Sequence, residues 1–173
     1  MTTTTSPAIG SRLTSRLAAT IAFVVTLAAI AGAWGSQIFG GLVPCELCLE
    51  QRLPYYFGLP LLAVLLLFWH RLPRAAWYGL LAAVIALFAW GLYLGICHAG
   101  VEWRFWPGPT ACTGTGLDVS FDDLSNINAT RIVPCDAVQF RLLGISLAGY
   151  NALVMLGAIA LLAWTAMKGR NPG

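Results

Sequence analysis

Two cysteines separated by two residues, with an arginine one helical turn later, are the groups in this chain best suited to chemistry. Cys45, Cys48 and Arg52 all lie in the stretch 44–52. On a helix they would share one face, because residues three and four apart are neighbours. A helix N-terminus and a nearby cation both stabilise a thiolate, the form of cysteine that exchanges disulfides. The spacing therefore indicates a redox-active pair or, alternatively, half of a metal site.

Cys112 and Cys135 form a second candidate pair further along the chain. One interpretation is a structural disulfide that only restrains the segment between them. The other is a redox role, which a CxxC motif on the same membrane face would favour. A zinc site built from all four cysteines fits less well, because closed zinc sites commonly use two tight ligand pairs. We therefore expect no metal.

The composition is that of an integral membrane protein. Of 173 residues, 58% are hydrophobic and only 10% are charged, and the mean hydropathy is +0.76. Soluble domains carry about 25% charged residues. The sequence contains no phosphate-binding loop, HExxH motif or extended basic patch, which argues against nucleotide hydrolysis, metalloprotease chemistry and nucleic-acid binding.

Four apolar segments predict an all-α membrane protein, a four-helix transmembrane bundle. The predicted spans cover residues 17–34, 44–69, 75–97 and 142–167. The apolar part of the second span is short, so its helix is expected to begin near Pro44, with bending or local unwinding near Pro54 and Pro60. A cleaved signal peptide is the alternative for the first span.

These spans define one transmembrane domain, residues 17–168, after a polar arm (1–16) and before a short tail (169–173). One set of termini and loops carries six basic residues and no acidic one: Arg12, Arg16, Arg71, Arg74, Lys168 and Arg170. Short basic loops stay in the cytoplasm, so both termini are expected there. The two other loops, about 35–44 and 98–141, then lie in an oxidising outer compartment, where disulfides persist.

The CxxCxxxR motif, the later cysteine pair and the four predicted spans resemble the DsbB family of bacterial disulfide-bond-forming quinone reductases. The resemblance covers nearly the whole chain below the N-terminal arm, including the segment 98–109 ahead of Cys112. It implies a bacterial inner-membrane enzyme with periplasmic cysteine loops. It also implies that Cys112 forms the mixed disulfide with a reduced thioredoxin-fold partner of the DsbA type, and that Cys135 is the disulfide partner of Cys112.

The same resemblance implies that Cys45 and Cys48 reoxidise the loop disulfide. Cys48 and Arg52 are then expected beside a membrane quinone, either ubiquinone or menaquinone. Arg52 could instead be an arginine that only extends its head to the membrane surface. His98 either lines the quinone pocket or caps its helix, and Cys97 is expected to be a small packing residue.

Other functions remain open at this point. A DsbB paralogue or a VKOR-like oxidase would use the same chemistry on a different thiol partner. A non-enzymatic membrane scaffold would use both cysteine pairs as structural disulfides. Mixing with a reduced thiol partner separates these cases, because a scaffold keeps its disulfides and an oxidase exchanges them.

Overall fold

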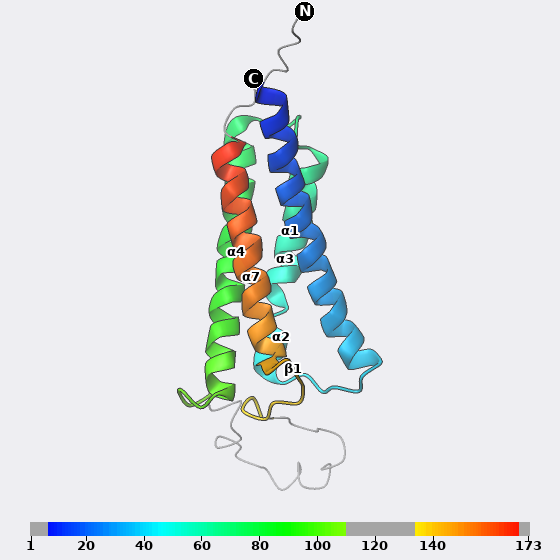
Figure 1. Cartoon of the computed structure of the whole chain (residues 1–173), viewed down its shortest axis with the longest axis vertical. Coiled ribbons are helices and arrows are strands. Elements are labelled where there is room, and N and C mark those ends of the chain that lie inside the picture. Colours follow the sequence, from blue (N-terminus) through cyan, green and yellow to red (C-terminus); the bar gives the residue numbers. More distant parts are fainter. Residues whose placement is uncertain (1–6, 110–133, 170–173) are drawn as a thin grey trace, which may run out of the picture.

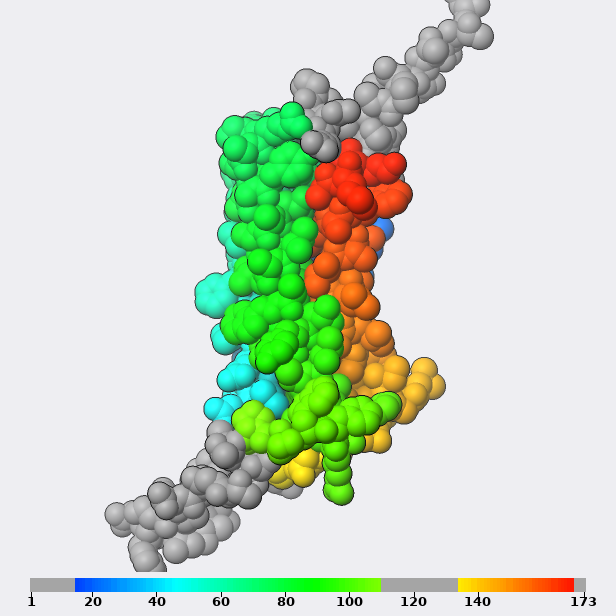
Figure 2. All heavy atoms as spheres, turned by 90° about the vertical axis from the view of Figure 1, so that its left-hand side faces the viewer, coloured from blue at the N-terminus to red at the C-terminus, as the bar shows by residue number. Residues whose placement is uncertain are grey.

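The structure is a computed structural model that describes residues 7–109 and 134–169, with side chains described from Ser15 onward. Four helices run side by side in one elongated bundle (Figure 1). They are α1 (Pro7–Ile38), α3 (Leu53–Leu67), α4 (Arg74–Glu102) and α7 (Leu147–Lys168). The start of α1 and the end of α7 lie at the same end of the bundle, and α4 packs along the length of α7 (Figure 2).

Three of these helices are long and apolar enough to cross a membrane. They are Ser15–Ile38 within α1, Arg74–Glu102 (α4) and Leu147–Lys168 (α7). The predicted second span corresponds to α3, whose 15 residues fall short of the roughly 20 that a straight crossing needs. The chain is thus a mostly helical membrane protein with three candidate spans by length and composition.

The predicted helix from Pro44 onward is divided into two parts. The short helix α2 (Glu46–Glu50) begins after Cys45, and Gln51 and Arg52 form the turn that leads into α3. Pro54 lies in the first turn of α3, where a missing backbone N–H costs no helical hydrogen bond. The expected local unwinding near Pro54 therefore takes the form of a break just before it, which places the cysteines in their own turn of helix.

A small hairpin precedes α7 and departs from the all-helical prediction. Strand β1 (Arg141–Leu142) pairs antiparallel with β2 (Ile145–Ser146). The two turn residues, Leu143 and Gly144, both have positive φ values of 50° and 83°, as a tight two-residue hairpin requires. The predicted fourth span, which began at residue 142, therefore starts as a helix only at Leu147, after Ser146 has capped it.

The interior of the bundle is apolar and closely packed. Its fully buried side chains include Phe88, Leu62, Leu65, Leu81, Met155 and Leu162. Glycines allow the helices to approach: a Cβ at Gly58 would lie 2.5 Å from the Phe88 ring. This packing fixes the positions of α3, α4 and α7 relative to one another.

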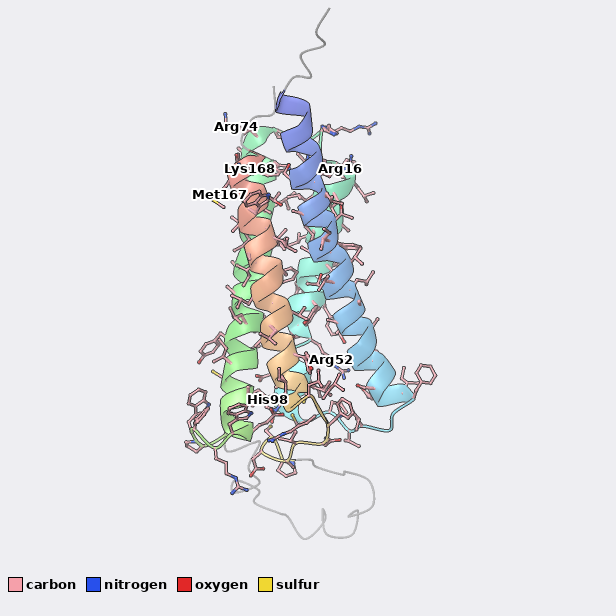
Figure 3. All side chains as sticks on the ribbon, in the orientation of Figure 1. Arg16, Arg52, Arg74, His98, Met167 and Lys168 are labelled. Atoms are coloured by element: carbon pink, nitrogen blue, oxygen red, sulfur yellow. The ribbon has the colours of Figure 1, made fainter. Side chains whose placement is uncertain are left out.

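The two ends of the bundle differ in charge. Arg16, Arg74 and Lys168 lie at one end, and Arg52 and His98 lie at the other (Figure 3). At the second end, α4 continues to Glu102, beyond the predicted limit at residue 97. Trp106 then folds back over Gly100, where a Cβ would lie 1.9 Å from its ring, and its indole N–H donates to the Cys97 carbonyl at 2.9 Å.

Candidate functional site

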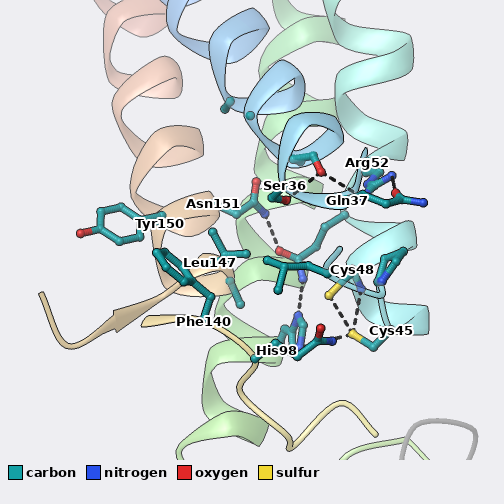
Figure 4. Close-up of a pocket in the computed structure, with 18 of the residues that line it drawn as sticks. Ser36, Gln37, Cys45, Cys48, Arg52, His98, Phe140, Leu147, Tyr150 and Asn151 are labelled. Atoms are coloured by element: carbon teal, nitrogen blue, oxygen red, sulfur yellow. Dashed lines mark hydrogen bonds between the residues drawn. The ribbon is translucent and has the colours of Figure 1, made fainter. Parts of the chain in front are cut away.

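A cavity of about 390 Å³ opens at the end of the bundle that carries Arg52 and His98 (Figure 4). Small residues of α1, among them Gly32 and Ala33, form one wall, and Tyr150 and Val154 of α7 form another. Cys45, Cys48, Arg52, His98 and Cys135 all line the same cavity. Ligand sites for small molecules are typically about 300–1,000 Å³, mostly apolar, with a few polar groups, and this cavity fits that description.

The two cysteines of the CxxC motif meet at the floor of the cavity. Cys45 is the N-cap of α2, and its sulfur accepts the backbone N–H of Cys48 at 3.4 Å. The two Sγ atoms are 2.8 Å apart, and both cysteines are free thiols. That distance is longer than the roughly 2.05 Å of a disulfide bond, and it places the two sulfurs in direct contact.

The contact between the two sulfurs makes the thiols unequal. The hydrogen bond from Cys45 lowers the pKa of Cys48, and the positive charge of Arg52 acts in the same direction, whereas burial and the charge of Glu102 oppose it. The same contact, together with burial, raises the pKa of Cys45. Cys48 is therefore the more acidic thiol of the pair, and Cys45 the less acidic one.

Arg52 is buried, with 8% of its surface exposed. Its Nη1 donates to Gln37 Oε1 at 2.9 Å and its Nη2 to the Ala33 carbonyl at 3.5 Å. Its guanidinium also lies over the Trp34 ring, 5.1 Å from the centroid. These contacts hold the cation against α1 at the cavity wall, rather than extended into solvent as a surface arginine would be.

His98 lies within α4, one turn before its end, and its side chain enters the cavity. Its Nε2 is 3.7 Å from Cys45 Sγ and 3.9 Å from Glu102 Oε1. Its Nδ1 contacts Gln51 Nε2 at 2.6 Å. Because α4 continues past His98, its side chain belongs to the cavity and does not cap the helix.

Cys135 lies close to the CxxC motif. It takes part in a disulfide bond and shares a small buried cluster with Cys45, Leu47 and Val101. Gln139 joins the two outer segments, because its amide donates to the Val43 carbonyl at 2.5 Å and accepts the Val43 N–H at 3.1 Å. Cys112, the fourth predicted redox cysteine, lies outside the described residues.

Three potential metal ligands lie together in the cavity. The ligand atoms of Cys45, Cys48 and His98 all lie within 4.8 Å of one another. Zn–S bonds of about 2.3 Å in a tetrahedral site separate two sulfurs by roughly 3.8 Å, whereas these sulfurs are 2.8 Å apart. The arrangement suits a dithiol about to form a disulfide better than a zinc site.

Several polar residues of the site were not predicted from the sequence. They are Gln37, Gln51, Tyr55, Glu102, Gln139 and Asn151. Asn151 had a signal that could have been used, because a polar amide inside an apolar span commonly marks a functional site. The others are ordinary loop or helix residues whose role depends on contacts with distant parts of the chain.

Known proteins similar to this chain were identified by two kinds of match. A family model described as "Disulfide bond formation protein DsbB" matches residues 15–165. A protein of Azoarcus sp. (strain BH72) named "Disulfide bond formation protein B" is 30% identical over 141 residues, which cover 78% of this chain and 81% of that protein. No solved structure matches.

Proposed function

Since this chain belongs to the DsbB family of disulfide-forming membrane oxidases, we propose that it transfers electrons from a DsbA-like periplasmic dithiol protein to a membrane quinone. The observation that carries the proposal is the cavity in which a low-pKa thiol, Cys48, and a buried guanidinium, Arg52, line one apolar space. The balanced reaction is partner dithiol plus quinone giving partner disulfide plus quinol. Two electrons and two protons move in each turnover.

The cavity fits a quinone ring in size and in lining. The apolar walls from α1 and α7 would hold the ring, and Arg52 would place a positive charge near a ring oxygen, where negative charge develops. When bound, a quinone supplies a lipid-soluble two-electron oxidant. DsbA-like proteins are strong oxidants that ordinary disulfides cannot regenerate, so an acceptor of this kind is needed.

The steps on the protein follow the order of the sulfurs. The partner thiolate attacks Cys112 of a Cys112–Cys135 disulfide, and Cys135 leaves as a thiolate. Once the partner has formed its own disulfide, the loop dithiol reduces a Cys45–Cys48 disulfide. With a quinone bound as the two-electron acceptor, Cys48 would be the sulfur that delivers the electron pair, and Cys45 would lose its proton and close on Cys48 to restore the disulfide.

The position of Cys135 in the same buried cluster as Cys45 supports the internal exchange, because thiol–disulfide exchange needs access of one sulfur to another. Cys135 and Cys45 share one buried cluster. Gln139 links their two loops through Val43. The position of Cys135 thus supports electron transfer from the loop disulfide to the CxxC motif.

The proposed orientation places the cysteine loops in the periplasm and both termini in the cytoplasm of a bacterial inner membrane. The basic residues Arg16, Arg74 and Lys168 gather at the opposite end from the cavity, as short cytoplasmic segments do. In this arrangement α2 and α3 together provide the fourth crossing. The redox cofactor is ubiquinone or menaquinone, and no resident metal is proposed.

The decisive experiment is quinone reduction by the purified protein with a reduced DsbA-like partner, followed by the ultraviolet absorbance of the quinone. Cys48→Ser is expected to abolish quinol formation, whereas Cys97→Ser, a change at the free thiol outside the cavity lining, retains it. A scaffold would keep its disulfides when mixed with the reduced partner, and neither the parent protein nor the Cys97→Ser variant would form quinol. Oxidation of a different thiol protein, but not of the DsbA-like one, would indicate a paralogue or a VKOR-like oxidase.

A further inference from the structure

A chain of hydrogen bonds between buried and half-buried side chains connects α3, α7, the α2–α3 turn and α4 to the CxxC motif. Tyr55 O–H donates to Asn151 Oδ1 at 2.5 Å, and Asn151 Nδ2 donates to Gln51 Oε1 at 2.7 Å. Gln51 Nε2 then contacts His98 Nδ1 at 2.6 Å. The chain thus runs from α3 through α7 and the α2–α3 turn to α4, and it ends 3.7 Å from the Cys45 sulfur.

The order of donors and acceptors along this chain is fixed from its buried end. Tyr55 is 4% exposed, and a buried hydroxyl without an acceptor is costly. The Tyr55 O–H therefore donates to Asn151 Oδ1. The amide N–H₂ of Asn151 is then turned toward Gln51, whose carbonyl oxygen accepts. The remaining amide group of Gln51, its N–H₂, faces His98.

This order determines which nitrogen of His98 carries the proton. Neutral imidazole has one N–H and one lone pair. Because Gln51 donates to Nδ1, that atom holds the lone pair and the proton is on Nε2. The Nε2–H then faces the Cys45 sulfur at 3.7 Å, with Glu102 Oε1 at 3.9 Å and the Cys135 backbone as further acceptors for the ring.

We propose that Gln51 and Asn151 are positioning residues that hold His98 as a hydrogen-bond donor to the Cys45 sulfur. Such a donor stabilises the Cys45 thiolate whenever Cys45 attacks or leaves, and in this tautomer His98 cannot take the Cys45 proton. The role of the Cys45 thiolate in turnover rests on the function proposed above. The tautomer of His98 is independent of that function, and it can be measured without any substrate.

The first test is the nitrogen spectrum of histidine-labelled protein in lipid. The chain has two histidines, so His70→Gln leaves His98 as the single signal. A protonated Nε2 and an unprotonated Nδ1 are expected in this background. Asn151→Leu should give a mixture of tautomers, whereas Thr26→Val, which removes a buried hydroxyl that bonds only within α1 and lies outside the cavity lining, should not. A protonated Nδ1 in the parent protein, or the same spectrum after Asn151→Leu, would overturn the proposal.

The second test measures the Cys45 thiolate directly. In a Cys48→Ser background, alkylation of Cys45 by iodoacetamide is followed by mass spectrometry of its peptide. Complete loss of one net hydrogen bond would lower the alkylation rate about fivefold, so the mixture of tautomers after Asn151→Leu predicts a smaller but measurable decrease, with no change after Thr26→Val. An unchanged rate would exclude the donor role. If the tautomer and the rate behave as expected but no quinol forms, the proposed function fails and this assignment stands.

Discussion

The two thiols of the CxxC motif differ because each has different neighbours. Cys48 has the Cys45 hydrogen bond and the charge of Arg52, which lower its pKa. Cys45 has His98 at 3.7 Å and lies beside Cys135. In the proposed function, Cys48 delivers electrons into the cavity and Cys45 exchanges with the loop disulfide.

The lowered pKa of Cys48 predicts a pH dependence of alkylation. The thiolate is the reactive form, so Cys48 should stay reactive at pH values below the usual thiol range of about 8.5 and lose reactivity only when the pH falls through its own lowered pKa. Cys45→Ala removes the hydrogen bond that contributes most to the shift, so the profile of Cys48 should move to higher pH. Iodoacetamide alkylation with peptide mass spectrometry measures both profiles, and coincident profiles would show that the contact does not set the pKa.

The expected effect of Arg52 on quinone binding comes from a single buried positive charge. Arg52→His is expected to raise the KM for quinone roughly tenfold, since a charge-assisted hydrogen bond contributes about 1.5–3 kcal/mol, while thiol exchange with the partner continues. Arg104→His, at an exposed position beyond α4, is the matched control. An unaltered KM for Arg52→His would mean that the guanidinium serves packing alone.

At the scale of elements, the sequence singled out five residues that line the cavity, because their signals are local, and it missed several further polar residues of the lining. The CxxCxxxR spacing, Pro54 and the change in charge between the loops are all visible within a few residues. The division into α2 and α3 was foreseen only as local unwinding. The hairpin 141–146 was missed because two strands of two residues each carry no hydrophobic alternation.

The polar chain behind His98 could not be predicted from the sequence. Gln51 lies 47 positions from His98 and 100 from Asn151, and these contacts exist only after the helices have packed. No motif describes them. The Gln139–Val43 contact, across 96 positions, was out of reach for the same reason.

That contact between the outer loops yields a prediction at the same scale. Gln139→Leu removes two hydrogen bonds that join the segment of Cys135 to the segment of Cys45. Oxidation of the protein partner should slow by about fivefold, the effect of roughly one net hydrogen bond, while quinone reduction driven by dithiothreitol, which can reduce Cys45–Cys48 directly, stays the same. Asp136→Asn, at a nearby exposed position, serves as the control. An equal loss with both reductants would place the defect in the cavity instead.

The whole molecule has one basic end and one reactive end, and this polarity sets its expected orientation. A reporter that is active only in the cytoplasm should work when fused after Gly173 and fail when inserted at Gly40, in the segment between α1 and α2. A reporter that is active only in the periplasm should give the opposite result. Cytoplasmic activity at Gly40 would contradict the orientation and, with it, the contact between the cysteines and a periplasmic partner.

The shortness of α3 has one more consequence. Fifteen residues rise about 22 Å, against roughly 30 Å of hydrocarbon in a bilayer. If α3 begins its crossing at the cytoplasmic surface, its Leu53 end does not reach the periplasmic headgroups. The turn with Gln51 and Arg52 then lies at the depth of the acyl chains. An oxidant dissolved among the lipid tails would then reach the thiols by lateral diffusion, without passing through water.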